Sequence, residues 1–402
     1  MASTSCNDLA AELLASCLKG EAWSEDLLAQ LARSECSDAL FRVVVERLAD
    51  LFEPRLCDVY ARMFSHLIAC ALPELSAVDL LARYQRIRQP RPLTCDPKVV
   101  FVLSRVTLGA DVAVTSVLLD AAKRRFPQAR IMLAGSRKSW ELFAGDPRVE
   151  HAPVPHLRSG SLSERLAPWR DLRHMLHQPD AIVLDPDSRL TQLGLLPVCP
   201  DELYRFFESR AYGGDGDDPL PVLTARWCGE VLGVSDAVPW FAPAQAVEIP
   251  GHPLVTISLG VGENPAKRVA DPFEESLVRL VAQTGAYVLI DEGAGGEEAQ
   301  RVARVLAICS AAGRVRSFRG SFAQFASAIS RSDLYVGYDS AGQHVAAACA
   351  VPLLSIFAGS PSARFFSRWR PWGKGKMEVI PVAQHTSPIE LCSRALKKLL
   401  PS

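Results

Sequence analysis

Short apolar runs alternate with amphipathic helical segments over most of the chain after residue 97. "VVFVL" (99–103) and "AIVLD" (181–185) have the length and continuous apolar character of strands that are buried on both faces. The alternation stops at the proline-rich stretch 238–253 and starts again with "LVTISLG" (254–260). Because this pattern is typical of βαβ units, it predicts an α/β fold with two doubly wound, Rossmann-like lobes joined by a hinge.

The N-terminal part of the chain follows a different pattern. Apolar residues recur there at helical spacing, as in Leu9, Leu13 and Cys17, and no strand-like run is present. The proline-rich stretch 88–97 ends this pattern. We therefore predict three domains, which are listed here in chain order: an all-helical N-terminal domain (1–95), a first Rossmann-like domain (96–245), and a second Rossmann-like domain that ends in a C-terminal helix (246–402).

Composition excludes several classes of protein. A formal net charge of -1 argues against a nucleic-acid-binding protein, which would carry a strongly basic domain. No apolar run approaches the ~20 residues that a membrane-spanning helix needs, and the N-terminus lacks the basic start of a signal peptide. The 11 cysteines form no CxxC pair and no metal-ligand spacing, so we expect most of them to be buried free thiols in a reducing cytoplasm.

The segment "YVGYDSAGQHVAAACAVPLLSIF" (335–357) contains three polar residues at the junction of a strand and a helix. Asp339, Ser340 and His344 could bind an anion there, because a helix N-terminus favours negative charge and Gly342 would allow a sharp turn. The same residues could also form a hydrolytic triad, although no GxSxG turn is present. A third interpretation is that Asp339 or Ser340 only caps the helix and His344 only packs.

Two other segments follow the first strand of each lobe. "ISLGVGENPAKRV" (257–269) contains Lys267 and should emerge at the same sheet edge as Asp339. "SRVTLGADVAVTS" (104–116) contains Asp111, which either caps the next helix or reaches the cleft as a reactive carboxylate. Neither segment is a Walker A loop, since GxxxxGK[ST] is absent.

Together these segments resemble glycosyltransferase family nine, the ADP-heptose:lipopolysaccharide heptosyltransferases and their relatives. "YVGYDSAGQHVAAACAVPLLSIFAGSPSARFFSRWRPWG" is similar to the family's strand–Asp–Ser/Thr–Gly–x–x–His block and the segment after it. "VVFVLSRVTLGADVAVTSVLLDAAKRRFPQARI" is similar to the family's first strand, Gly–Asp turn and helix, and "LGVGENPAKRV" to its Lys–Arg segment. The resemblance covers about residues 97–385 and implies a GT-B fold and an inverting, metal-independent glycosyl transfer.

The resemblance also implies roles for individual residues. Asp111 would be the general base, and Lys267 would bind the donor phosphate. The remaining implied donor contacts surround the diphosphate, the ribose and the base, and they are Asp339, Ser340, Ala341, Gly342, His344, Glu292 and Ser321. The sequence departs from the family in "GAD" (109–111), in "SAG" (340–342), where Ala341 stands for a glycine, and in "GSP" (359–361).

The expected function is thus transfer of a sugar, with heptose first among the candidates, from a nucleotide-diphosphate donor to a hydroxyl acceptor. The nucleotide sugar would be a co-substrate, and no metal or other cofactor is implied; "GGDGDD" (213–218) is expected to be a mobile surface loop. The acceptor could be a glycan, a lipid-linked glycan as in lipopolysaccharide synthesis, or a polypeptide. The chain could act at the cytoplasmic side of the inner membrane and oligomerise through its N-terminal helices. One alternative is a non-catalytic nucleotide-sugar-binding or assembly protein of the same fold, and another is a sugar-nucleotide epimerase.

Overall fold

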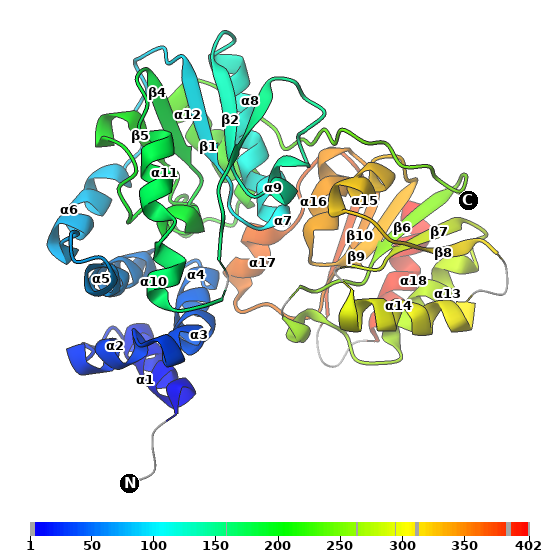
Figure 1. The fold of residues 1–402 in the computed structure, drawn as a ribbon. Coiled ribbons are helices and arrows are strands. Elements are labelled where there is room, and N and C mark those ends of the chain that lie inside the picture. Colours follow the sequence, from blue (N-terminus) through cyan, green and yellow to red (C-terminus); the bar gives the residue numbers. More distant parts are fainter. Residues whose placement is uncertain are drawn as a thin grey trace.

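The computed structural model describes residues 5–157, 159–262, 264–293, 295–309, 313–382 and 387–400. Helices form the N-terminal part, and two separate parallel sheets with helices around them form the rest (Figure 1). No helix in these ranges is long and apolar enough to cross a membrane.

The N-terminal region is helical, as predicted. Its elements are α1 (Cys6–Lys19), α2 (Glu25–Leu31), η1 (Ser34–Cys36), α3 (Ser37–Ala39), the π turn η2 (Leu40–Val45), α4 (Glu46–Asp50), α5 (Pro54–Ala71) and α6 (Ala77–Ile87). The predicted apolar stripe faces inward, since Leu13 and Cys17 of α1 are fully buried. Ser5 caps α1 through a reciprocal capping box with Asp8, and Gly20 ends the helix in the left-handed conformation.

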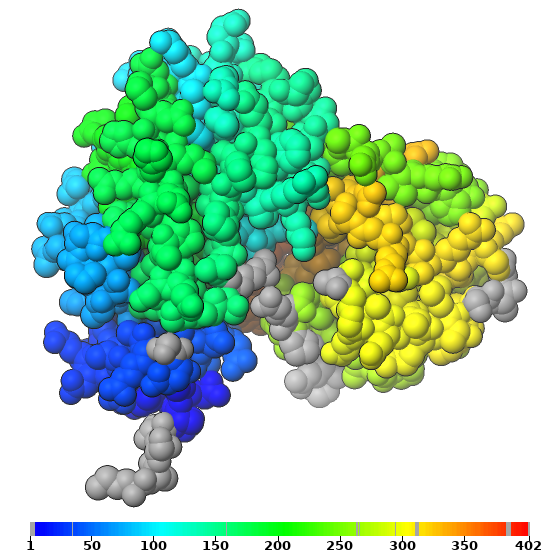
Figure 2. All heavy atoms as spheres, in the orientation of Figure 1, coloured from blue at the N-terminus to red at the C-terminus, as the bar shows by residue number. Residues whose placement is uncertain are grey.

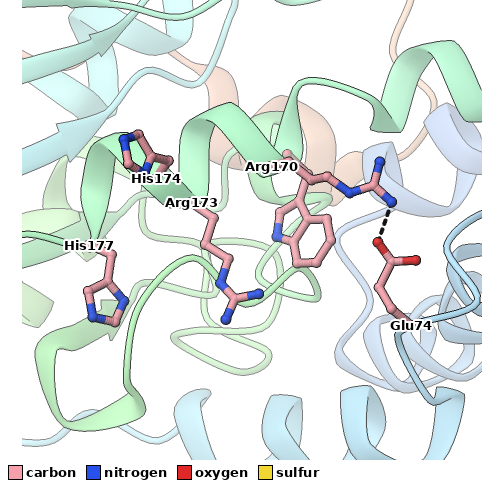
Figure 3. Close-up of a pocket in the computed structure, with 6 residues that line it drawn as sticks. Glu74, Arg170, Arg173, His174 and His177 are labelled. Atoms are coloured by element: carbon pink, nitrogen blue, oxygen red, sulfur yellow. Dashed lines mark hydrogen bonds and ion pairs between the residues drawn. The ribbon is translucent and has the colours of Figure 1, made fainter.

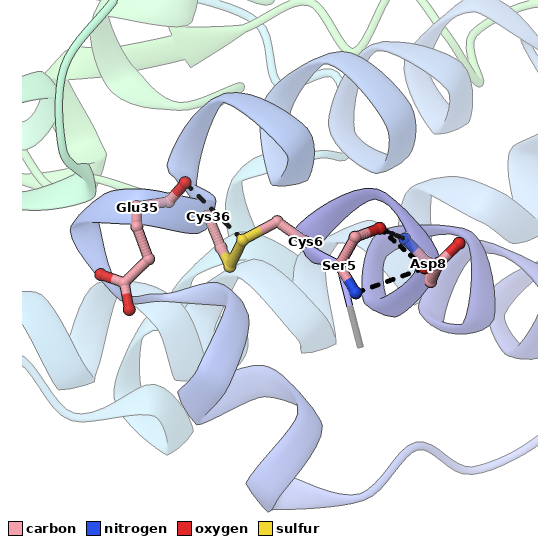
Figure 4. Close-up of a disulfide and its surroundings, with 5 residues drawn as sticks. All are labelled: Ser5, Cys6, Asp8, Glu35 and Cys36. Carbon is pink, nitrogen blue, oxygen red and sulfur yellow. Dashed lines mark hydrogen bonds between the residues drawn. A yellow bond between two sulfur atoms is a disulfide. The ribbon is translucent and has the colours of Figure 1, made fainter. Parts of the chain in front are cut away.

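The expectation of free thiols is wrong for one pair. Cys6, at the start of α1, is joined by a disulfide to Cys36 in the 3₁₀ turn η1 (Figure 4). The remaining cysteines are free, but Cys70 and Cys95 are exposed rather than buried. The spacing of Cys6 and Cys36 gave no signal of pairing, because only the packing of α1 against η1 brings the two residues together.

The first lobe contains a parallel sheet in the order β3-β2-β1-β4-β5. Its strands are β1 (Val99–Leu103), β2 (Arg130–Gly135), β3 (Val149–Pro153), β4 (Ala181–Asp185) and β5 (Tyr204–Phe206). Its helical elements are α7 (Leu108–Ala110), the π turn η3 (Asp111–Thr115), α8 (Ser116–Arg125), α9 (Arg137–Trp140), α10 (Leu162–Leu166), α11 (Trp169–Leu176), η4 (Arg189–Thr191), η5 (Asp201–Leu203) and α12 (Leu220–Leu232). The predicted strands β1 and β4 are confirmed. The sequence missed β3 and β5 because polar residues such as His151 and Arg205 interrupt their apolar character.

The second lobe contains a parallel sheet in the order β11-β10-β9-β6-β7-β8. Its strands are β6 (Leu254–Ser258), β7 (Tyr287–Asp291), β8 (Val315–Phe318), β9 (Leu334–Tyr338), β10 (Leu353–Phe357) and β11 (Met377–Pro381). Its helical elements are η6 (Pro265–Lys267), α13 (Phe273–Ala282), α14 (Gly296–Cys309), α15 (Phe322–Ile329), α16 (Ala341–Ala348), α17 (Ala363–Trp369) and α18 (Pro388–Leu399). Two parallel sheets of this kind confirm the predicted fold class.

The two lobes touch closely along one face. A single buried apolar cluster contains Val112 and Val117 of the first lobe together with Phe325 and Val345 of the second. Burial of such surface contributes roughly 25 cal/mol per Å², so the apolar contact favours the closed arrangement. The connecting stretch 238–253 contains no helix or strand.

The loop 213–218 lies at the surface, as predicted, and contacts the second lobe. Three arginines on or next to α17 in the second lobe hold it. Arg364 pairs with Asp215 at 2.9 Å, while Arg368 donates 2.7 Å to the carbonyl of Asp218. Arg370 donates to the carbonyl of Asp217 at 3.2 Å.

Candidate functional site

The carboxyl edge of the second sheet gathers the predicted donor-binding residues. Lys267 follows β6, Glu292 follows β7, Ser321 follows β8 and Asp339 follows β9. These strands are neighbours in the order β9-β6-β7-β8 and run parallel, so their carboxyl ends lie at one edge. Ligands of open α/β sheets bind outside this edge.

An ion pair lies at the centre of this edge. The Lys267 Nζ atom is 2.7 Å from Oδ2 of Asp339, whose side chain is only 6% exposed. Gln343 donates to the other oxygen, Oδ1, at 2.7 Å, and Ser355 donates to the Gln343 carbonyl. The sequence gave no signal for Gln343 or Ser355, which hold Asp339 in place from behind.

The start of α16 next to this pair bears on the three interpretations of the motif at 339–344. Ser340 is the N-cap residue, but its side chain makes no capping hydrogen bond, so it does not merely cap the helix. Its Oγ atom lies 3.5 Å from the Tyr335 hydroxyl. No hydrogen bond joins Ser340 to His344 among the residues that the structure describes, so the hydrolytic triad is not assembled. Binding of an anion at this helix start stays a prediction.

Gly342 serves a different purpose from the one predicted. It lies within the first turn of α16, and its φ is not in the left-handed region. A Cβ atom on Gly342 would overlap the ring of Tyr335, and a Cβ on Gly337 would also meet it. Glycine is therefore required because the helix backbone lies directly on an aromatic ring.

His344 is buried at the same helix and carries no charge at neutral pH. Burial lowers the pKa of this imidazole to about 4; the carboxylate of Asp339 opposes that shift, while the charge of Lys267 adds to it. The ring lies 5.9 Å from the ring of Trp369, edge to face. His344 can thus offer a neutral N–H to a ligand but no positive charge.

The first lobe meets the second at the start of α16. A Cβ on Gly109 would lie 3.2 Å from the Ala341 Cα atom and 3.4 Å from Cδ2 of His344. Glycine at 109 therefore allows the two backbones to approach. Ala341, which replaces a family glycine, is the residue that faces this approach.

Asp111 lies just behind Gly109, and it is completely buried. Its carboxylate accepts hydrogen bonds from Ser104 Oγ, the Arg105 backbone N–H and Thr115 Oγ1, each at 2.8 Å. Burial raises the pKa of this carboxyl, and the three hydrogen bonds oppose the shift. In this arrangement Asp111 holds the turn after β1 and presents no surface to a substrate.

The extra residue of the "GAD" turn has a structural consequence. Residues Asp111–Thr115 form a π turn, in which the backbone hydrogen bonds span one more residue than in an α-helix. Asp111 is the first residue of this turn.

Aromatic residues of α17 line the space between the lobes, and the sequence interpretation missed them. Trp369 lies between His344 and Arg105, whose guanidinium is 5.7 Å from the ring centroid. The Phe365 ring lies 5.0 Å from Nζ of Lys267. The aromatic run "RFFSRWRPW" (364–372) was the only signal available, and it is equally typical of a helix core.

The remaining predicted residues have simpler surroundings. Glu292 is half-buried, and its backbone N–H donates to the carbonyl of Phe318 at 3.0 Å. Ser321 caps α15 in a reciprocal capping box with Gln324. The Ser321 hydroxyl thus already accepts a hydrogen bond from the backbone of α15. A contact to a nucleoside base through the Ser321 backbone stays a prediction.

A separate cavity of about 340 Å³ lies between the N-terminal region and α11. Its walls carry Glu74, Trp169, Arg170, Arg173, His174 and His177 (Figure 3). Arg170 points to Glu74 and pairs with it. None of these residues belongs to the second lobe. Across the described ranges, no group of three or more His, Cys, Asp or Glu side chains could hold a metal ion.

Comparison with protein-family models gives one match. Residues 246–395 match the model of glycosyltransferase family 9 (heptosyltransferase). The predicted family resemblance is therefore confirmed over the second lobe. No curated protein matches the chain in sequence.

Solved structures of similar fold span both lobes. A family 9 glycosyltransferase from Veillonella parvula has a TM-score of 0.57 at 16% identity, over 77% of this chain and 98% of that one. E. coli ADP-heptose LPS heptosyltransferase II has a TM-score of 0.54 at 18% identity, over 75% and 98%. E. coli heptosyltransferase WaaC with ADP has a TM-score of 0.55 at 13% identity, over 75% and 100%. The shared part is the two-lobed GT-B fold.

Proposed function

We propose that this chain, whose residues 246–395 form a family 9 glycosyltransferase domain, transfers a sugar from a nucleoside-diphosphate donor to a hydroxyl group. The observation that carries the proposal is the Lys267–Asp339 ion pair beside the uncapped start of α16. A lysine and the positive end of a helix are together suited to a diphosphate.

The proposed donor is ADP-heptose. Support comes from the family model and from similarity to heptosyltransferases, one of which is described with ADP. In this proposal Glu292 and Ser321 lie next to the nucleoside, while Ser340, Ala341, Gly342 and His344 lie next to the diphosphate. The acceptor is a glycan, a lipid-linked glycan or a polypeptide.

We further propose inversion at the anomeric carbon without a metal ion. The acceptor oxygen forms its bond to the anomeric carbon as the bond to the diphosphate breaks, and the electron pair leaves with the nucleotide. The charge of Lys267 and the α16 dipole would stabilise the negative charge that develops on the leaving group. Such preorganised electrostatic stabilisation is usually the largest contribution to catalysis.

The family resemblance assigns the general base to Asp111. For this role the carboxylate would have to become accessible, because its oxygens already accept three hydrogen bonds within the first lobe. Opening of the lobes about the stretch 238–253 is one way to expose it. The alternative is a non-catalytic nucleotide-sugar-binding protein of this fold. Turnover of the donor by the purified protein would exclude it.

Calorimetry with ADP, GDP and UDP tests the donor site. Lys267→Met should weaken binding of the preferred nucleotide by about 10- to 100-fold, since a hydrogen bond to a charged group is worth ~1.5–3 kcal/mol. Because this variant leaves Asp339 without its cation, the double variant Lys267→Met/Asp339→Asn should be measured beside it. Lys398→Met is the matched control, as Lys398 is an exposed lysine of the same lobe that pairs with Glu378.

The proposal would be wrong if wild-type protein bound none of the three nucleotides. It would also be wrong if both Lys267 variants kept wild-type affinity while remaining folded.

A further inference from the structure

Phe52, which lies between α4 and α5 of the N-terminal helical region, has a strained backbone. Its φ is +54°, in the left-handed region. Among the described residues before β1, no other residue except glycine has a positive φ. A bulky side chain is an outlier in this region, and such a conformation persists only where the surrounding structure holds it. The contacts around Phe52 must therefore compensate for this cost.

The second lobe holds the backbone of this turn. The Phe52 carbonyl accepts a hydrogen bond from Nε of Arg364 in α17 at 2.8 Å. Ser362, the N-cap residue of α17, donates to the Leu51 carbonyl at 3.5 Å. Arg364 also pairs with Asp215 of the first lobe at 2.9 Å. One arginine of α17 thus connects the N-terminal region with both lobes (Figure 1).

The Phe52 ring packs on two aromatic rings of α17. It is 2% exposed, and it lies 6.3 Å from the ring of Phe365 and 6.2 Å from that of Trp369. The interplanar angles are 70° and 80°, so both contacts are edge to face, an arrangement that aromatic pairs favour. The strained turn therefore places one ring of the N-terminal region against both of these residues.

These two rings of α17 border the candidate site. The Phe365 ring lies 5.0 Å from Nζ of Lys267, and the Trp369 ring lies 5.9 Å from the ring of His344. Trp369 is partly exposed, and the space-filling view shows α17 at the bottom of a hollow between the two lobes (Figure 2). One layer of side chains thus separates Phe52 from the lysine and the histidine of the site.

The position of the Lys267 ammonium depends on the nearer of these rings. Its described partners are the carboxylate of Asp339 at 2.7 Å and the ring of Phe365. Attraction between an ammonium and an aromatic ring requires the cation to stay over the ring, within about 6 Å of its centre. A displacement of Phe365 would remove this contact, and Phe52 packs where it opposes such a movement.

We propose that Phe52 is a positioning residue of the donor site, through which the N-terminal helical domain takes part in binding a nucleoside diphosphate. It keeps the Phe365 ring beside Lys267 and the Trp369 ring beside His344. The ammonium and the imidazole are then in place before the diphosphate arrives, which lowers the cost of binding it. The inference rests on the proposed function, and it assigns a role to a domain that supplies none of the residues at the sheet edge.

The experiment compares Phe52→Leu with Phe64→Leu in the full-length chain. Phe64 is the matched control, because it is fully buried in the same domain and its ring packs on Phe41 and Tyr60. Both variants should unfold at a lower temperature, since each loses buried aromatic contacts. Calorimetry with ADP, GDP and UDP should show that Phe52→Leu weakens binding of the preferred nucleotide by about 3- to 10-fold, as expected for residues that are coupled by contact. Phe64→Leu should leave this affinity within about twofold.

A second measurement shows whether Phe52 acts through the site. In the Lys267→Met background, Phe52→Leu should weaken nucleotide binding by less than it does in the otherwise wild-type chain, because the ammonium beside Phe365 is already absent. A merely structural role would give the same loss of affinity in both backgrounds, since it does not depend on the lysine.

Arg364→Met keeps the test open if Phe52→Leu does not fold. This variant removes the hydrogen bond to the Phe52 carbonyl but leaves the Phe52 ring. It should weaken nucleotide binding in the same direction, by about 2- to 5-fold. Arg394→Met changes an exposed arginine of α18 in the same lobe and should leave the affinity unchanged.

The inference would be overturned if folded Phe52→Leu or Arg364→Met protein bound the nucleotide with wild-type affinity. It would also be overturned if Phe64→Leu lost as much affinity as Phe52→Leu, or if the loss from Phe52→Leu were the same in the Lys267→Met background. Failure of wild-type protein to bind ADP, GDP or UDP would instead overturn the proposed function, and this inference with it.

Discussion

The two lobes place similar polar residues at their facing edges but use them differently. In the second lobe Lys267 remains 20% exposed beside Asp339, at a helix start that no side chain caps. In the first lobe the corresponding turn encloses Asp111 completely within three hydrogen bonds. The comparison shows that a residue can lie at the family position of a reactive group without being accessible.

The difference follows the extent of the family match. Residues 246–395, which match the family model, keep the lysine, the aspartate and the strand–helix junction. The first lobe lies outside the match, contains an additional residue at Ala110 and packs against a helical domain. The N-terminal domain also contacts the second lobe, where the Phe52 carbonyl accepts a hydrogen bond from Arg364.

The largest expected effect comes from Asp111→Asn. The amide would place a donor where the carboxylate accepts hydrogen bonds, so the free energy of unfolding should fall by about 2–3 kcal/mol. Urea unfolding measures this change. Asp236→Asn is the control, because Asp236 is an exposed carboxylate of the same lobe that pairs with Arg124. A fully stable but inactive Asp111→Asn protein would contradict the structural role and restore Asp111 as the base.

His344 allows a test of the second lobe by pH. Because the folded pKa is about 4 and the ordinary value is 6.5, the unfolded chain binds a proton between these values and the folded chain does not. The unfolding free energy of wild type should therefore decrease as the pH falls from 6.5 to 4. His344→Gln should lack this part of the decrease. An equal decrease in both proteins would show that the imidazole is not buried as described.

Ser321→Ala should have the smallest effect. Loss of the α15 cap should lower the unfolding free energy by ~1 kcal/mol. ADP affinity should stay within about twofold, since the side chain is committed to the backbone of α15 and a base contact would use only its backbone. Thermal unfolding and calorimetry measure the two quantities. A large loss of affinity with unchanged stability would mean that the hydroxyl contacts the nucleotide directly.

Much of the candidate site could be predicted because its parts are local. Each of Lys267, Glu292, Ser321 and Asp339 follows a strand, and the parallel order of the strands brings them to one edge. Sequence alone could not identify Gln343 or Tyr335, since a glutamine in a helix and a tyrosine in a strand are ordinary there. Gln343 has a role because its amide donates to Asp339, and Tyr335 because the backbone of α16 at Gly342 lies on its ring.

The sequence by itself determined the two lobes, most of their strands and the sheet edge that gathers the candidate site residues, because periodicity and parallel topology act over short stretches of chain. Only the tertiary structure decided which groups are accessible. It enclosed Asp111, joined Cys6 to Cys36 and brought Phe52 to Arg364 across 312 positions. Burial and contacts of this kind depend on which distant surfaces meet, and no local pattern contains that information.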